Sequence, residues 1–209
     1  MKDAADRLTP LGVMVLALLR EGDMHPYEMI RLMRQRHDDR MITITNGSLY
    51  HTVSRLERAG LLDEVRIDRD GNRPERTTYT LTDIGYDAMT DWVRRELGRI
   101  DHPAEFRIAL AEAHNLQRSE VVDLLIARRG ALIGDHAAHH AGLENARARD
   151  VPEQFLVEIE RQEALIDAEV RWTDGFIARL QSPDLPWGPE ELPAEHFPTY
   201  LAQRKAAQL

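Results

Sequence analysis

The segment from residue 44 to residue 81 constrains the fold more than any other part of the chain. Leu49, Val53 and Leu56 lie four and three residues apart, which places their side chains on one face of a helix. Gly60 follows where a helix commonly ends in a residue with positive φ. The pattern predicts a short helix that packs on a core and stops at this glycine.

A β-hairpin is predicted directly after this helix. Segments 62–67 and 77–81 flank Asp70-Gly71-Asn72, and Asp-Gly suits a tight turn between two strands. A short helix followed by such a hairpin is typical of a winged helix-turn-helix. The polar side of the helix carries small, hydrogen-bonding side chains that fit a DNA major groove about 12 Å wide. We therefore expect DNA contacts from Asn46, Ser48, Tyr50, His51, Thr52 and Arg55.

Two roles stay open for Tyr50, whose hydroxyl could meet the DNA backbone or whose ring could pack under the wing. The loop between the strands mixes arginine with acidic residues, so it does not form a general polyanion-binding patch. Such a wing suits one or two contacts with a phosphate or the minor groove. We expect these contacts from Arg73 and Arg76.

The charge distribution agrees with a DNA-binding first half. The net charge is −9, but residues 1–100 carry 16 Lys and Arg against 17 Asp and Glu, whereas residues 101–209 carry 11 against 19. The acidity therefore lies in the second half, and a DNA-facing surface in the first half need only be basic locally. The chain has no cysteine, which excludes disulfides and thiol catalysis and fits a reducing compartment.

Further helices are predicted on both sides of the central segment. Thr9-Pro10 caps a helix through Leu19, His25-Pro26 starts another, and Thr82-Asp83 caps a third that runs to about Leu97. The longest apolar run, residues 11–19, is about half the length of ~20 residues that a membrane span needs. The N-terminus has too little positive charge before this run to resemble a secretion signal. We expect no membrane partner and a cytoplasmic protein.

Three motifs in residues 8 to about 95 are similar to the PadR family of bacterial transcriptional regulators. They are Gly47-Ser48-Leu49-Tyr50, the segment 56–62 (Leu-Glu-Arg-Ala-Gly-Leu-Leu) and the segment 79–85 (Tyr-Thr-Leu-Thr-Asp-Ile-Gly). The sequence departs from the family at Asn46, where many members have proline, and at His51, where proline often follows the tyrosine. Because both lie at the reading end of the helix, they are where the DNA preference of this chain is expected to reside.

Residues 99–181 are predicted to form a second, all-α domain after the winged helix-turn-helix domain of residues 1–98. One helix, capped by Ser119 and running to about Arg149, and another after Pro152 carry residues of a packed seam at spacings of three and four. The seam of the first helix is predicted to consist of Val122, Leu125, Arg129, Leu132, His136, His139 and Leu143. The second helix has an additional apolar seam, Leu165, Trp172 and Phe176, which a single partner helix cannot cover. We expect another subunit to cover it, and the resemblance implies dimerisation by a helical C-terminal domain. Residues 182–209 form a proline-rich tail, expected to wrap over the protein surface or, alternatively, to be disordered.

Aromatic residues and a histidine cluster are candidates for two further kinds of site. The resemblance implies small, often aromatic effectors, and an apolar pocket for one could draw on Trp92, Phe106, Trp172 and Phe176, although aromatic residues at helical spacing are more often core. The spacing of His136 and His140 could chelate a metal, with His139 beside them. We expect these histidines to pack and hydrogen-bond instead, with no metal and no cofactor. No catalytic motif appears, so we expect no enzyme.

Together these features predict a mainly α-helical transcriptional regulator. It would bind a palindromic operator in double-stranded DNA as a homodimer, act as a repressor and be released by a small effector. The alternative is a winged-helix protein-interaction module without DNA binding, which the negative net charge supports.

Overall fold

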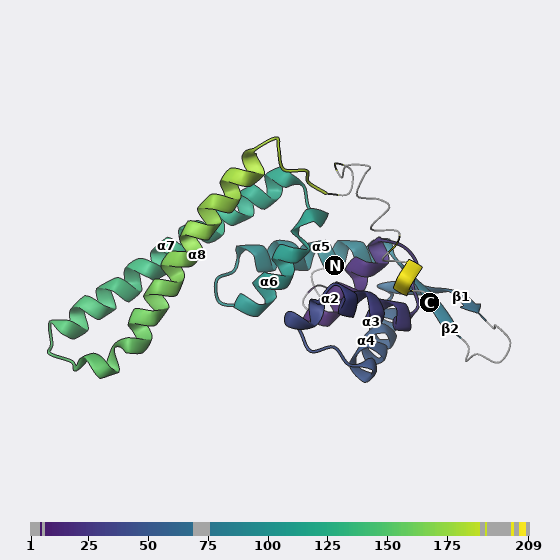
Figure 1. Cartoon of the computed structure of the whole chain (residues 1–209), viewed down its shortest axis with the longest axis horizontal. Coiled ribbons are helices and arrows are strands. Elements are labelled where there is room, and N and C mark those ends of the chain that lie inside the picture. The colour runs from purple at the N-terminus through teal and green to yellow at the C-terminus, as the bar shows by residue number, and fades with distance from the viewer. Residues whose placement is uncertain are drawn as a thin grey trace.

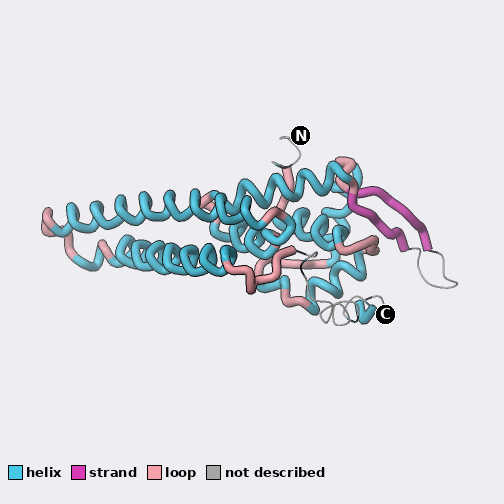
Figure 2. Tube along the Cα trace, turned by 90° about the horizontal axis from the view of Figure 1, so that it is seen from above, coloured by secondary structure: helices cyan, strands magenta, loops and turns pink. Residues whose placement is uncertain are grey.

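The computed structural model describes residues 7–68 and 76–188, together with residues 5, 191, 202 and 205–207. The chain is mainly helical, as predicted, with a single described hairpin of two strands. Helices α2 to α6 and the hairpin form a head, and helices α7 and α8 form a long antiparallel arm (Figure 1). Figure 2 shows that the arm and the hairpin leave the head in opposite directions.

The first two helices of the head begin at capped prolines. Helix α2 covers Pro10–Arg20, and the Thr9 hydroxyl accepts a hydrogen bond from the backbone N–H of Gly12 at 3.2 Å. Helix α3 covers Pro26–Gln35, and Nδ1 of His25 accepts from the backbone N–H of Glu28 at 3.0 Å. A short 3-10 turn, Asp38–Arg40, then leads towards the next helix. Both predicted starts are confirmed, because proline supplies a helical φ where no N–H is needed.

Helix α4, Asn46–Arg58, ends as predicted at a glycine with positive φ. Gly60 has φ +70°, its N–H donates to the carbonyl of Glu57 at 2.8 Å, and the N–H of Leu61 donates to that of Leu56 at 3.0 Å. These two bonds make a Schellman motif, which satisfies carbonyls at the helix end.

The hairpin pairs β1, Leu62–Asp68, with β2, Arg76–Leu81. A bulge interrupts the ladder between Glu64 and Arg66, so Val65 has no partner and is 53% exposed. The predicted strands are confirmed, but a bulge breaks the simple alternation of side chains along β1. Backbone hydrogen bonds between Met24 and Tyr79 hold the base of the hairpin against the segment before α3.

Helices α5 and α6 complete the head. Helix α5 covers Asp83–Gly98 and starts at the predicted Thr82 cap, and α6 covers Pro103–Ala111. Both pack against α2, and the short turn Ala113–Asn115 follows them. A single apolar cluster from these helices, α3 and α4 forms the core, and it continues into the base of the arm through Val121, Leu125, Ile177 and Leu180.

The arm consists of α7, Arg118–Arg147, and α8, Val157–Gln181, with a short turn at Glu153–Phe155 between them. Helix α7 begins one residue before Ser119, so the predicted cap at this serine is wrong. The predicted seam of α7 is also out of register in part. Val121 and Arg128 are the buried residues, whereas Val122 and Arg129 were predicted. Leu125, Leu132 and Leu143 are buried as expected.

The two sides of the arm differ in the residues they expose. Arg129 pairs with Asp174 on one side, and Arg128 pairs with Glu169 on the other. Ile126 and Ile133 lie three and four residues from Arg129, and Leu165 and Trp172 lie four and three residues from Glu169. All four are between 43% and 50% exposed. The arm therefore has one exposed apolar surface on each side.

Within the part of the chain that the structure describes, no helix has the length and apolar character needed to cross a membrane.

Candidate nucleic-acid interface

A polar stripe on α4 is the candidate DNA-reading surface. The exposed positions recur at spacings of three and four along the helix, so they share one face. We name this face the recognition stripe; it consists of Gly47, Tyr50, His51, Ser54 and Arg58. Tyr50 is 51% exposed, which favours the first of its two open roles over packing beneath the wing. Ser54 and Arg58 were not among the predicted contacts, although they continue the spacing of Tyr50 and His51 along the helix.

Thr52 was expected on this polar face, and that placement is wrong. Its side chain is 6% exposed. It lies three residues after Leu49 and four before Leu56, both of which are buried. Residues at these spacings are neighbours on one helix face, so Thr52 lies at the edge of the buried side.

The start of α4 has a complete capping box. The hydroxyl of Thr45 accepts from the N–H of Ser48, and the hydroxyl of Ser48 accepts from the N–H of Thr45, both at 3.0 Å. The Ser48 side chain is therefore engaged in capping the start of the helix, whereas Asn46 and Gly47 are exposed beside it. Free backbone N–H groups at such a terminus can hold a phosphate.

Arg55 makes contacts within the head. Its Nη2 donates to the hydroxyl of Thr9 at 2.8 Å, and its Nη1 donates to the carbonyl of Arg7 at 3.4 Å. It joins α4 to the start of α2 and is half-buried at the edge of the recognition stripe. Arg73 lies outside the described residues, as does the side chain of Arg76. The wing contacts therefore stay predictions.

The four aromatic residues of the expected effector pocket fall into two groups. Trp92 is 2% and Phe106 7% exposed, so both are part of the core. The rings of Trp172 and Phe176 stack on each other with centroids 5.2 Å apart, and Trp172 is 44% exposed. The structure does not join the four rings into one pocket, because of these four only the last two are in ring contact.

Two histidines of α7 are hydrogen-bonded, His140 to a carboxylate and His139 to a backbone carbonyl. Nδ1 of His140 lies 2.8 Å from Oε1 of Glu163, and the rings of His136 and His140 are parallel. Nδ1 of His139 lies 2.9 Å from the carbonyl of Asp135. Among the described residues, no group of three or more His, Asp or Glu side chains is arranged to hold a metal ion.

A polar cavity of about 210 Å³ lies between α2, the segment after α3, and the end of α6. Glu21, Arg36, Asp38, Glu112 and His114 line it together with apolar residues of α2. Burial, and then the charges of Glu21 and Asp38, raise the pKa of Glu112 to about 7. Burial also raises the pKa of Asp38 and lowers the pKa of His114. The cavity is a place where folding is linked to proton binding.

Glu112 is expected to make the protein less stable as the pH rises from about 5 to 8. Its pKa in the folded chain, about 7, is above the ordinary value of 4.5, so the folded state binds more protons than the unfolded state. The contribution is fully present below pH 4.5 and is lost as the pH passes 7. His114 acts in the opposite direction, so the comparison with Glu112→Gln is what isolates the effect. Urea titrations should show that the free energy of unfolding falls over this pH range by about 1–3 kcal/mol more in the parent protein than in Glu112→Gln. Parallel pH profiles of the two proteins would contradict the assignment.

The arrangement of the head defines a winged helix-turn-helix domain. It has two helices joined by a turn, an exposed stripe on the second helix, and a two-stranded wing after it. Residues 15–91 match the family described as "Transcriptional regulator PadR-like family". The match covers the head of the chain, and it confirms the resemblance to this family seen in the three motifs.

Several solved structures are similar over most of the chain. Bacillus subtilis PadR in complex with operator DNA is 19% identical, with a TM-score of 0.39, 82% of this chain covered and 99% of that chain. The same protein in complex with p-coumaric acid is 17% identical, with a TM-score of 0.37 and coverage of 83% and 100%. The protein smu.1604c from Streptococcus mutans UA159 is 16% identical, with a TM-score of 0.38 and coverage of 80% and 98%. No curated protein sequence matches the chain at a significant level.

Proposed function

We propose that this transcriptional regulator is a homodimeric repressor that binds a palindromic operator. The observation that carries the proposal is the recognition stripe, a polar helix face left open in a PadR-like head. The stripe would enter the major groove, while Asn46 and the N-terminus of α4 approach a phosphate. Arg55 would hold α4 in place against the head through its bond to Thr9 at the start of α2.

The Trp172 side of the arm supports the dimeric part of the proposal. Leu165 is 46% and Trp172 44% exposed on a helix whose other face is already packed against α7. Exposed aromatic and aliphatic side chains in line are typical of a surface that another subunit covers. A two-fold dimer would present two heads to DNA, with half-sites about one helical turn, roughly 34–36 Å, or a multiple of it, apart.

An effector would act by changing the distance or angle between the two heads. A small aromatic ligand would shift the dimer between two arrangements only by its difference in affinity for them. The protein would bind such a ligand in the cytoplasm, where its operator DNA also lies.

Footprinting on the DNA upstream of the protein's own gene tests the proposal. Protection of two symmetric half-sites, with affinity that falls steeply as salt increases, is the expected result. A lack of DNA binding at low salt, together with tight binding of a protein partner, would support the protein-interaction module instead.

His51→Ala is expected to weaken binding to the footprinted operator by about 1–3 kcal/mol, the effect of losing one good base contact. The reason is that His51 lies in the middle of the recognition stripe and is exposed. Binding to unrelated DNA should change little, so the ratio of the two affinities, measured at one salt concentration, is the quantity to compare. The matched control is Gln35→Ala, an exposed residue at the end of α3. Equal specificity ratios for both variants would remove His51 from the reading surface.

A further inference from the structure

Arg128 lies where three helices meet at the junction of the head and the arm. It belongs to α7 and its side chain is 1% exposed. Its guanidinium carbon lies 3.6 Å from the ring centre of Phe106 in α6, and its Nη2 donates to Glu169 in α8. Its Nε and Nη1 are buried and find no hydrogen-bond partner among the described residues. One side chain thus contacts the head and both helices of the arm.

The burial of Arg128 is not explained by stability. Removing a guanidinium from water is costly, and one ion pair with two unsatisfied N–H groups repays that cost poorly. A buried ion pair can often be replaced by apolar residues without loss of stability. What an apolar residue cannot replace is direction, because a guanidinium both stacks on a ring and pairs with a carboxylate in its own plane.

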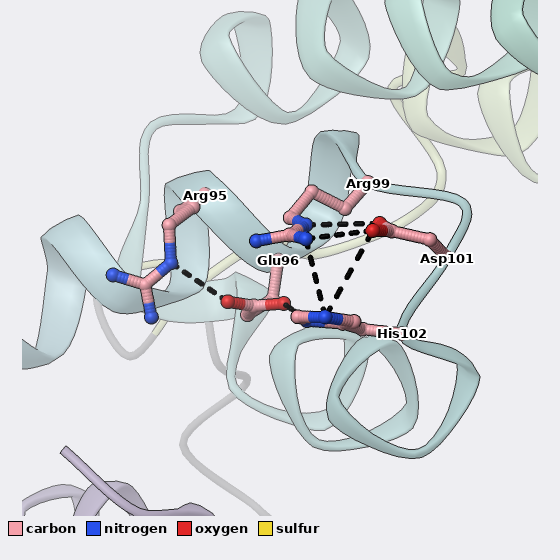
Figure 3. A network of polar contacts seen from close by, with 5 residues as sticks. All are labelled: Arg95, Glu96, Arg99, Asp101 and His102. Carbon is pink, nitrogen blue, oxygen red and sulfur yellow. Dashed lines mark hydrogen bonds and ion pairs between the residues drawn. The ribbon is translucent and has the colours of Figure 1, made fainter. Parts of the chain in front are cut away.

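Phe106 is itself held in a fixed place relative to α5 within the head. Figure 3 shows the polar network between the end of α5 and the start of α6. Glu96 of α5 is buried, and its carboxylate receives Nε of Arg95 at 2.7 Å and Nδ1 of His102 at 3.1 Å. Arg99 pairs with Asp101 at 2.7 Å and also lies 3.1 Å from Nε2 of His102. Because His102 directly precedes α6, the network sets the direction in which this helix leaves α5.

An ion pair that directly joins the head to the arm is a weaker guide to their angle. Nε of Arg94 in α5 lies 2.5 Å from Glu120 in α7, but the two side chains are 41% and 34% exposed. Exposed pairs of this kind contribute little and are screened by salt. Arg128 and Phe106 are both screened from water, so their contact is the more directional one.

We propose that Arg128 is a positioning residue that sets the angle between the arm and the head. In the dimer, which rests on the function proposed above, the same contact sets the distance between the two recognition stripes and hence the operator spacing that the protein accepts. The stack on Phe106 orients the arm, and the bond to Glu169 keeps α8 in register with α7.

The angle can be measured without DNA. The chain has no cysteine, so Gln35→Cys in the head and Asn145→Cys in the arm, both exposed, give two unique spin labels. Labelled full-length protein, diluted with unlabelled protein to suppress distances between subunits, should give one narrow distance distribution. Arg128→Met is expected to broaden or shift it. Arg129→Met, a change at the next residue of α7, breaks the exposed pair with Asp174 of α8 and should leave the distance distribution unchanged.

A second variant keeps the test valid if Arg128→Met does not fold. Phe106→Leu preserves an apolar residue in α6 but removes the ring under the guanidinium, so it should broaden the distribution in the same way. The proposal would be overturned if every variant that folds gave the same distance distribution as the parent protein. It would also be overturned if Arg129→Met broadened the distribution equally. Failure of both to fold would also overturn it, because the site would then be required for folding itself.

Operator spacing gives the second readout. For the parent protein, two extra base pairs between the half-sites should cost on the order of 10²-fold in affinity, because the second head can no longer engage. Arg128→Met should reduce this penalty to below about tenfold while remaining a dimer. An unchanged penalty with normal DNA binding would overturn the inference alone, whereas a parent protein that binds no operator would overturn the proposed function instead.

Discussion

Replacing Gly85 with alanine will lower the free energy of unfolding by about 1–3 kcal/mol or more, the typical cost of adding atoms to a well-packed site. A Cβ atom at residue 85 would lie 1.9 Å from the carbonyl oxygen of Leu61, far inside van der Waals contact. The obstacle is backbone, so no side-chain rotation can relieve it. Either α5 or the segment that ends α4 must move.

That movement would break a set of bonds that joins the two helices. The hydroxyl of Thr82 donates to the carbonyl of Gly60 at 2.8 Å and accepts from the N–H of Gly85 at 3.0 Å. The N–H of Thr82 also donates to the carbonyl of Leu61 at 3.3 Å. The cap of α5 and the end of α4 thus share one network, and a shift of either one disturbs the recognition stripe.

Urea denaturation measures this effect, with Gly142→Ala as the control. Gly142 lies in α7, and an added Cβ there would meet nothing within 4 Å. Alanine is the better helix former by about 0.8–1.0 kcal/mol, so the control should be as stable as the parent protein or more so. A Gly85→Ala protein that unfolds at the same urea concentration as the parent protein would show that the close approach is not required.

The sequence predicted the head well because its signals are local. Thr9, Thr82 and Gly60 act through hydrogen bonds or φ angles within a few residues of themselves, and each does in the structure what the local pattern predicted. The two strands of the hairpin also pair as their local patterns predicted, whereas the predicted turn at Asp70-Gly71-Asn72 lies outside the described residues. The bulge at Val65 was not predictable, because nothing in the local sequence marks the extra residue.

Predictions that depended on the direction of a side chain were less accurate. Thr52 is polar, so it was assigned to the polar face, but its spacing to Leu49 and Leu56 decides its position. In the arm, Arg128 is buried where its neighbour Arg129 was expected. A pattern of apolar spacing cannot choose between two adjacent arginines. The choice depends on Phe106, which is distant in sequence and reaches Arg128 only through the fold.

The dimer proposal makes the second large prediction, because the arm exposes apolar residues on both of its sides. Leu165 and Trp172 lie on the side of Glu169, and Ile126 and Ile133 lie on the side of Asp174. The Trp172 side has the larger side chain, stacked on Phe176 and so already ordered before a partner binds. Ordered aromatic residues lose little conformational entropy on association, which favours this side as the subunit interface.

Trp172→Glu is therefore expected to give a folded monomer that binds the operator on the order of 10²–10⁴-fold more weakly, because each head must then bind alone. The tryptophan is 44% exposed in the single chain, so a charge at this position is compatible with folding but not with burial between two subunits. Light scattering gives the mass, and titration of the two-half-site operator at fixed salt gives the affinity. The matched control is Ile126→Glu, a similar change at a residue that is 50% exposed on the other side of the arm, which should remain a dimer and bind as the parent protein does. A dimeric Trp172→Glu protein beside a monomeric Ile126→Glu protein would place the interface on the opposite side of the arm.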